Sequence, residues 1–223
     1  MERILHLYEL PYDENYPLVC FDEKPCALYG DVTPSVPAQA AEFDEKNQIK
    51  KRGRPKKIDY EYKRNGSCSV LLAVQPLTAW RKVSVCKDRK ATTFATFFKE
   101  LSENFPNAKK IRVILDNLNT HEFASFYTLL PAQEAFELSQ RFELYKTPVK
   151  GSWLNMAEIE LSAFSRICLD RRLDSVEKMD KEVQQLVKER IEKKIIIDWQ
   201  FTNEKARKTM NSHYVKINEK NNV

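Results

Sequence analysis

Residues 109–121, KKIRVILDNLNTH, decide between two descriptions of the whole chain. A largely apolar run from Ile111 to Leu115 ends in the carboxylate of Asp116, and two amides, a threonine and a histidine follow within five residues. Such a run predicts a short buried strand. Asp and Asn are common turn and cap residues, so this segment alone indicates a strand that ends in a turn. Whether Asp116 belongs to an active site depends on the acids that other segments place near it.

The segments before this strand predict three more strands and a helix. Residues 18–21 are apolar on both faces, as in a central strand, until Asp22 interrupts them. Residues 69–74 and the segment after the turn QPLT predict an antiparallel pair, and Arg-Asn-Gly at 64–66 predicts a tight turn before it. Aromatic residues recur at helical spacing over residues 91–106. A helix between two strands favours parallel pairing of residues 109–116 with the first strand.

The segments after this strand alternate between helix and strand. They predict helices at 122–141, broken near Pro131, a strand at 141–148, helices at 151–173 and 175–194, and a last helix in the tail. Three hairpin-type strands followed by alternating units is the order of a ribonuclease-H-like α/β fold. We therefore expect a mixed five-stranded sheet flanked by helices. The expected domains are a lead-in at 1–16, the α/β domain at 17–174 with a basic loop at 44–57, and a helical extension at 175–223.

The composition is that of a globular protein, with 42% hydrophobic and 31% charged residues among 223. No apolar stretch is long enough to span a membrane, and the N-terminus lacks the apolar core of a signal peptide, so we expect a cytoplasmic protein. Five cysteines without a C-x-x-C pair, and three scattered histidines, favour free thiols over a zinc site.

Basic residues gather in one window. Between Lys46 and Lys57 lie seven lysines and arginines and no acid, whereas the whole chain carries a net charge of only +5. A cluster of this density attracts polyphosphate by counterion release. The window lies in the proline-containing segment 31–57, which we expect to be a long exposed loop.

Three acids stand out by their position: Asp22 in the first strand, Asp116 at the end of the fourth, and Glu158 in the helix after the fifth. Each has an ordinary reading: a structural ion pair for Asp22, a turn or cap for Asp116 and a solvated helix acid for Glu158. If the first and fourth strands are neighbours, however, the two aspartates lie side by side and repel each other, and a divalent cation relieves this repulsion. Carboxylates suit Mg²⁺ or Mn²⁺, and a pair of such ions supports phosphoryl transfer.

Four ordered motifs add a family resemblance. CFDEK (20–24), DYEYKRNG (59–66), VILDNLNTH (113–121) and GSWLNMAEIELS followed by CLDRR (151–172) resemble the DDE transposases of bacterial insertion sequences in the Tc/mariner superfamily. The resemblance runs from about residue 10 to about residue 210. It implies a retroviral-integrase-like catalytic domain that cuts DNA and joins ends with two metal ions, Mg²⁺ or Mn²⁺. Asp22, Asp116 and Glu158 then match the three catalytic, metal-binding acids.

Glu160 competes with Glu158 for the third position. At about 100° per residue, the two glutamates flank the apolar stripe of the helix on opposite sides, so helix geometry does not choose between them. The family pattern Asn-x-x-Glu is matched by Asn155 and Glu158 and favours Glu158.

Other residues are candidates for supporting roles. Asn117 and Asn119 would order metal-bound water or cap the next helix, and His121 would contact a phosphate or merely begin that helix. Asn155 is a further accessory candidate. Lysines 146 and 150 flank the third acid, where they would hold phosphates. Trp153 would stack on an unpaired base or sit at the edge of the core.

The sequence KKRGRPKK (50–57) resembles an AT-hook, in which Arg52-Gly53-Arg54 would enter a narrow A·T minor groove. The alternative is a solvated basic loop whose side chains contact the DNA backbone non-specifically. The candidate DNA-binding residues are Lys51, Arg52, Arg54, Lys56, Lys57, Lys146, Lys150 and Trp153.

The expected function is metal-dependent DNA cleavage and strand transfer on element ends and target DNA by a homo-oligomer. Full-length relatives carry helix-turn-helix domains before the catalytic domain, whereas only 21 residues precede Asp22. We therefore expect a split-frame product that needs such a segment as a partner, or a truncated remnant. The alternatives are a non-catalytic DNA-binding protein that uses the basic loop and another nuclease of the ribonuclease-H-like fold.

Overall fold

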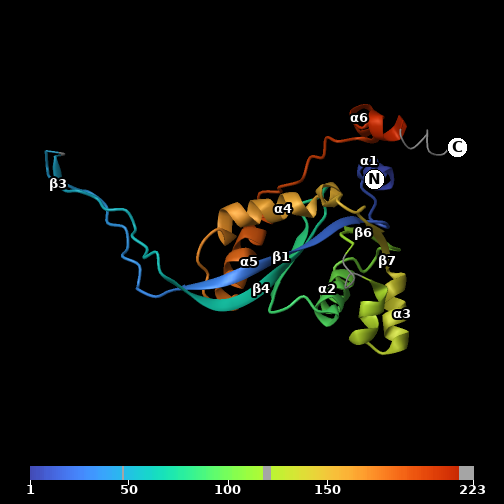
Figure 1. Cartoon of the computed structure of the whole chain (residues 1–223), viewed down its shortest axis with the longest axis horizontal. Helices are drawn as coiled ribbons and strands as arrows, with labels where there is room; N and C mark the ends of the chain where they lie inside the picture. The colour runs from blue at the N-terminus through green and yellow to red at the C-terminus, as the bar shows by residue number, and fades with distance from the viewer. Residues whose placement is uncertain (47, 118–121, 216–223) are drawn as a thin grey trace.

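The computed structural model describes residues 1–46, 48–117 and 122–215, and a five-stranded mixed sheet forms its centre (Figure 1). The strands, in the order in which they lie side by side, are β5 (Arg81–Cys86), β4 (Tyr62–Val74), β1 (Leu18–Asp31), β6 (Ile111–Leu115) and β7 (Phe142–Lys146). β1, β4 and β5 are antiparallel neighbours, whereas β6 is parallel to β1 and β7 is parallel to β6. This order and these directions confirm the predicted ribonuclease-H-like sheet and the predicted parallel pairing.

Helices cover both faces of the sheet. They are α1 (Glu2–Glu9), α2 (Ala91–Glu103), the 3-10 segment η1 (Phe123–Thr128), α3 (Ala132–Gln140), the 3-10 segment η2 (Ser152–Leu154), α4 (Ala157–Phe164), the π segment η3 (Ser165–Leu169), α5 (Val176–Glu192) and α6 (Asn203–Thr209). The predicted break near Pro131 separates η1 from α3, as expected. None of the helices within the described ranges has the length and apolar composition needed to cross a bilayer.

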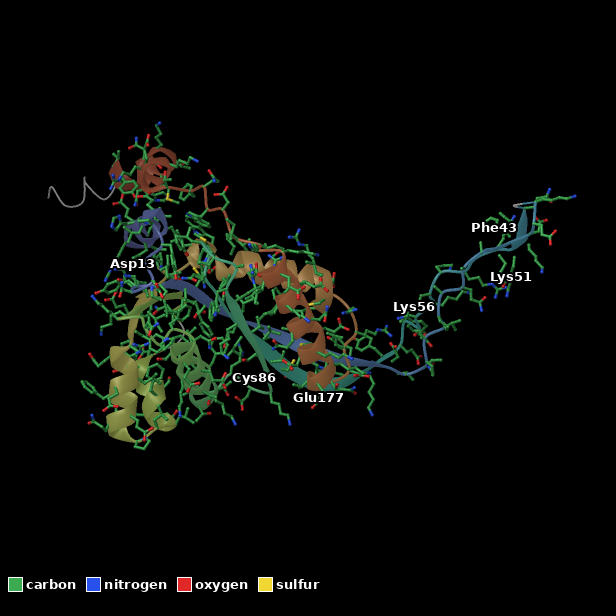
Figure 2. All side chains as sticks on the ribbon, turned by 180° about the vertical axis from the view of Figure 1, so that it is seen from behind. Asp13, Phe43, Lys51, Lys56, Cys86 and Glu177 are labelled. Atoms are coloured by element: carbon green, nitrogen blue, oxygen red, sulfur yellow. The ribbon has the colours of Figure 1, made fainter. Side chains whose placement is uncertain are left out.

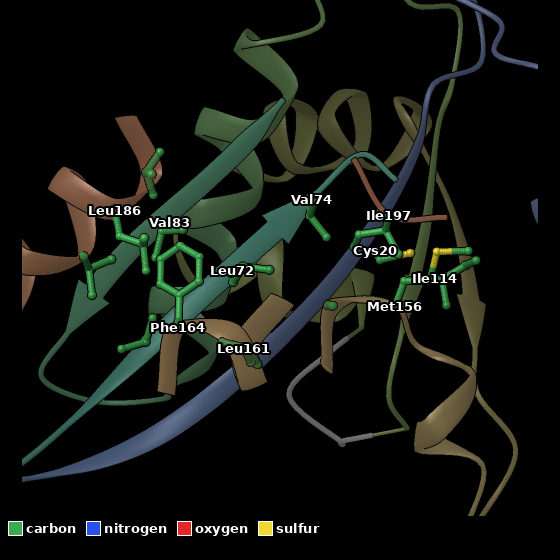
Figure 3. Close-up of a cluster of buried hydrophobic side chains, with 14 of the residues drawn as sticks. Cys20, Leu72, Val74, Val83, Ile114, Met156, Leu161, Phe164, Leu186 and Ile197 are labelled. Atoms are coloured by element: carbon green, nitrogen blue, oxygen red, sulfur yellow. The ribbon is translucent and has the colours of Figure 1, made fainter. Parts of the chain in front are cut away.

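Two apolar clusters hold the helices to the sheet because side chains of a strand alternate between its faces. Cys20 of β1 faces the cluster that also contains Leu161 and Phe164 of α4 and Leu186 of α5 (Figure 3). Phe21, the next residue, faces the opposite cluster, which is rich in phenylalanine from α2, η1 and β7. Full burial of each such side chain contributes about 1.5–3 kcal/mol. The two-faced apolar pattern of residues 18–21 therefore results from burial on both sides.

The helix α5, which follows the predicted domain boundary, packs against the same sheet. Its buried side chains Met179, Val183, Leu186 and Val187 lie in the cluster that contains Cys20. The proposed division of the chain at residue 174 stays a prediction, and packing joins α5 to the sheet.

The strands β1 and β4 are longer than the sequence predicted. β1 continues through Asp22 to Asp31, and it pairs with β4 as far as Tyr62. The turn predicted at Arg64-Asn65-Gly66 is wrong, because these residues lie inside β4, where the ladder shifts register. Gly66 has a φ of 110°, which favours glycine in a bulge for the same reason as in a turn.

The helix predicted at 151–173 begins later than expected. Residues 152–154 form the short 3-10 segment η2, and Asn155 has an extended backbone, with φ −86° and ψ 111°. α4 therefore begins at Ala157, and its last turn widens into the π segment η3.

Residues 32–61, which we call the arm, leave the body between β1 and β4. Figure 1 shows the arm projecting far from the sheet. Within it β2 (Glu42–Phe43) and β3 (Ile49–Lys51) pair antiparallel, and isolated bridges join Val36 to Lys57 and Gln39 to Arg54. The predicted long loop is thus exposed but paired with itself.

Candidate carboxylate site

Asp22 lies in β1, and Asp116 directly follows the neighbouring strand β6. The parallel ladder between β1 and β6 pairs Cys20 with Ile114, and each aspartate follows its paired residue by two positions. Both aspartates are half-buried. The backbone N–H of Glu23 donates a hydrogen bond of 2.8 Å to Oδ1 of Asp22. Because alternate residues share a face, Asp22 lies on the same side of β1 as Cys20, which is the side that α4 covers.

Glu158 reaches the same region from α4. It is exposed in the first turn of that helix. Asp22 and Glu158 together line one open cleft, whose other polar lining includes Lys24, Ser162 and Arg166. The fold thus brings two acids from distant parts of the chain to one solvent-accessible place.

Asn155 fixes the start of α4 against β1. Its Nδ2 donates a hydrogen bond of 2.7 Å to the carbonyl of Phe21, and its Oδ1 accepts one of 3.2 Å from the N–H of Ala157. The side chain is buried, and the N–H of Glu158 donates to the Asn155 carbonyl. One amide therefore holds the helix to the residue that precedes Asp22. The hydrogen bonds of Asn155 thus fix the position of the helical turn that carries Glu158.

Glu160 has a different environment from Glu158. Its side chain is only 1% exposed, and its Oε1 accepts hydrogen bonds of 2.6 Å from Nε of Arg81 and 2.7 Å from Nε of Arg190. Burial lowers the pKa of Arg81, and the charge of Glu160 opposes this shift. Both carboxylate oxygens of Glu160 are thus engaged by arginine. Helix geometry did not distinguish the two glutamates, but their burial does. Glu160 is buried in the core, and Glu158 lines the cleft.

Asp116 is not among the residues that line this cleft. Among the described residues, no three or more Asp, Glu, His or Cys side chains are arranged closely enough to hold a metal ion. The donor chemistry nevertheless fits, since carboxylate oxygens are the ligands that Mg²⁺ and Mn²⁺ prefer. Asn117 is exposed. The predictions for Asn119 and His121 fall outside the described residues.

The basic residues of the predicted loop lie on the arm, far from the carboxylates. Figure 2 labels Lys51 and Lys56 along it. Lys51 forms an exposed ion pair with Glu42 at 3.4 Å. Arg52, Arg54 and the two lysines at 56 and 57 are exposed. Gly53 allows the two strands of the arm to approach, because a Cβ there would lie 3.0 Å from the backbone nitrogen of Ala41.

The other predicted DNA contacts lie between β7 and α4. Lys146 forms an ion pair of 2.8 Å with Glu122. Lys150 is exposed and has a φ of 61°. Trp153 is 42% exposed, and its ring packs edge-on against Phe201 with centroids 5.5 Å apart. Part of the indole is therefore covered by the C-terminal segment, which gives Trp153 a packing role.

Two residues that line the cleft were not predicted from the sequence. Lys24 lies two positions after Asp22, so both occupy one face of β1, and Arg166 lies two helical turns after Glu158. These spacings are visible in the sequence. They indicate a shared cleft only once the full length of β1 and the start of α4 at Ala157 are known.

The sheet order and the helices on both of its faces are those of the ribonuclease-H-like class of folds. The family model described as DDE superfamily endonuclease matches residues 27–180. The chain therefore belongs to this family. The matched residues include Asp116 and Glu158 and begin five positions after Asp22.

A solved structure described as the mariner Mos1 paired end complex with Mg is also similar. The identity is 14% and the TM-score is 0.48, over 83% of this chain and 52% of that chain. This chain thus spans about half the length of the solved protein. Comparison with curated proteins gives no match.

Proposed function

We propose that this chain is the catalytic domain of a DDE transposase that cleaves DNA strands and joins their ends to target DNA. The observation that carries the proposal is that Asp22 and Glu158 line one open cleft, with Asp116 directly after the neighbouring strand. Asn155 ties the two sides of this cleft together. Membership in the DDE endonuclease family supports the same chemistry.

Asp22, Asp116 and Glu158 are the residues that would hold Mg²⁺ or Mn²⁺, with two ions expected. Such ions, when bound, lower the pKa of a water and neutralise charge on the phosphate in an in-line displacement. The protein contributes positions: a strand for Asp22, a strand end for Asp116 and a helix anchored by a buried amide for Glu158. No covalent enzyme intermediate is needed, so catalysis rests on orientation and charge neutralisation.

DNA contacts away from the chemistry would use the arm and the β7–α4 connection. The exposed cations of the arm extend beyond the body (Figure 2), which suits backbone contacts on DNA that leaves the site. Lys146, Lys150 and Trp153 would contact DNA near the cleft. An A·T preference of Arg52-Gly53-Arg54 would indicate minor-groove entry, and salt-dependent binding without that preference would indicate non-specific contact.

The partners of this function would be element ends, target DNA, a second copy of the chain and a helix-turn-helix segment that recognises the ends. These partners follow from the proposed transposition, which requires two ends to be held together.

The test is DNA cleavage by the protein on a labelled duplex with Mg²⁺, Mn²⁺ or chelator. We expect nicking that requires the metal and is lost in Asp116→Asn. Glu177→Gln, which removes an exposed acid from α5, serves as the control and should cleave like the wild type. Binding without nicking under every metal would favour a non-catalytic DNA-binding protein.

A further inference from the structure

The carboxylate cleft continues along β1 into a second open cleft. Lys24, Pro25, Ser165 and Arg166 line both of them. One wall of the combined groove is β1, and the other is α4 with its π extension η3. The groove therefore begins at Asp22 and Glu158 and runs away from them along the strand.

The junction of the two clefts carries two available cations. Within the described part of the chain, neither Lys24 nor Arg166 forms an ion pair, although Lys24 is half-buried and Arg166 is exposed. The other arginines of the groove are engaged: Arg171 pairs with Glu182, and Arg172 pairs with Asp31. The hydroxyl of Ser165 is also used, since it donates to a backbone carbonyl of α4. Lys24 on the β1 wall and Arg166 on the η3 wall are thus the two cations that line both clefts and form no ion pair within the described residues.

The far end of the groove lies at the root of the arm. Arg172 lines the second cleft, and its guanidinium donates to Asp31 at 2.8 Å and to the carbonyl of Tyr60 at 3.0 Å. Asp31 and Tyr60 flank the points where the arm leaves and rejoins the body. The groove consequently connects the acids to the base of the most basic segment of the chain.

We propose that Lys24 and Arg166 form a phosphate clamp that holds the DNA strand leaving the carboxylate cleft toward the arm. The proposal rests on the proposed function and adds a binding subsite on one side of the scissile phosphate. A strand rises about 3.3 Å per residue, so Lys24 lies about 7 Å along β1 from Asp22. That offset suits a phosphate adjacent to the one that is cleaved. Two cations on opposite walls can neutralise successive phosphates of a strand passing between them.

The first experiment measures binding of a labelled oligonucleotide at several salt concentrations in chelator, where cleavage cannot contribute. The variant Lys24→Gln with Arg166→Gln is compared with Lys181→Gln with Lys193→Gln, which removes the same charge from exposed lysines outside the groove. Each lost contact to a single strand lowers the slope of log K against log salt by about 0.7, so the groove variant should lose about 1.4. The control should keep the wild-type slope. Equal slopes for the two double variants would overturn the proposal.

The second experiment locates the contact relative to the cleaved phosphate. Cleavage in Mg²⁺ is measured on two substrates. In each, the DNA strand is shortened to one nucleotide on one side of the scissile phosphate, and the two substrates are shortened on opposite sides. The groove variant should show a larger rise in KM on the substrate that keeps the strand on the groove side than on the other substrate. An equal defect on both substrates would contradict a one-sided clamp. If the wild type cleaves neither, the proposed function fails, and the salt slopes still decide whether the clamp exists.

Discussion

Glu158 and Glu160 lie two residues apart on α4, and the same substitution should affect them in opposite ways. The carboxylate of Glu160 is buried with Arg81 and Arg190, and the side chain of Arg81 is fully buried as well. Glu160→Gln leaves two arginines without their counter-charge and turns an amide N–H₂ toward one of their donors. Glu158→Gln removes a charge from an exposed position that shares a cleft with Asp22.

The magnitude follows from these environments. Breaking a buried ion pair by removing one partner costs about 3–5 kcal/mol, a large share of the roughly 5–15 kcal/mol by which domains are stable. At about 2–4 °C per kcal/mol for a chain of this size, the Tm of Glu160→Gln should fall by about 6–20 °C. Glu158→Gln should stay within about 0.5 kcal/mol of the wild type, as other exposed substitutions do.

The assay is urea unfolding followed by circular dichroism, paired with Mg²⁺-dependent DNA cleavage below each unfolding midpoint. We expect Glu160→Gln to be destabilised yet to cleave DNA, and Glu158→Gln to be stable and inactive. A Glu160→Gln protein with wild-type stability would refute the buried ion pair. An inactive, stable Glu160→Gln beside an active Glu158→Gln would reverse the assignment of the third acid.

Two further predictions concern the contacts that hold the helices in place. Asn155→Ala removes the hydrogen bonds to Phe21 and Ala157, so that a helix cap is lost and a buried polar group is left unpaired. The free energy of urea unfolding should fall by about 2–4 kcal/mol. The control Asn104→Ala removes an exposed amide hydrogen bond and should cost under about 0.5 kcal/mol; equal losses in the two variants would contradict the anchoring role. The pKa of Glu2 is lowered from 4.5 to about 2, first by its hydrogen bond from Arg207. A lowered carboxylate pKa stabilises docking of α6 above about pH 4.5, and this contribution is lost as pH falls toward 2. The protection factors of the α6 amides, which correct for the intrinsic pH dependence of exchange, should therefore fall over that range. In Glu2→Gln they should be low already at neutral pH, and protection factors that do not depend on pH would count against the contact.

The core sheet was predictable because its signals are local. The apolar runs at 18–21 and 111–115, and the helical spacing of residues 91–106, each depend on neighbours within one element. Their order along the chain then fixed the parallel pairing of β1 with β6. The adjacency of Asp22 and Asp116 followed from this order, whereas Glu158 was assigned from the family pattern Asn-x-x-Glu.

The features that were not predicted depend on contacts between distant residues, or on residues that are typical of two different local structures. Asn65-Gly66 is typical of a hairpin turn, yet a bulge in a long strand needs the same positive φ. The burial of Glu160 depends on Arg81 and Arg190, which no local pattern connects to it. The pairing of the arm with itself likewise joins residues on either side of its tip.

The central claim is that Asp22, Asp116 and Glu158 serve one metal centre. Electron paramagnetic resonance of Mn²⁺ titrated into the protein measures this directly, because bound and free ions give separable signals. The claim predicts that the wild type binds Mn²⁺ and that Asp22→Asn, Asp116→Asn and Glu158→Gln each weaken the binding at least tenfold, while Glu177→Gln leaves it unchanged. Binding that is equal in the wild type and in all three variants would contradict the claim.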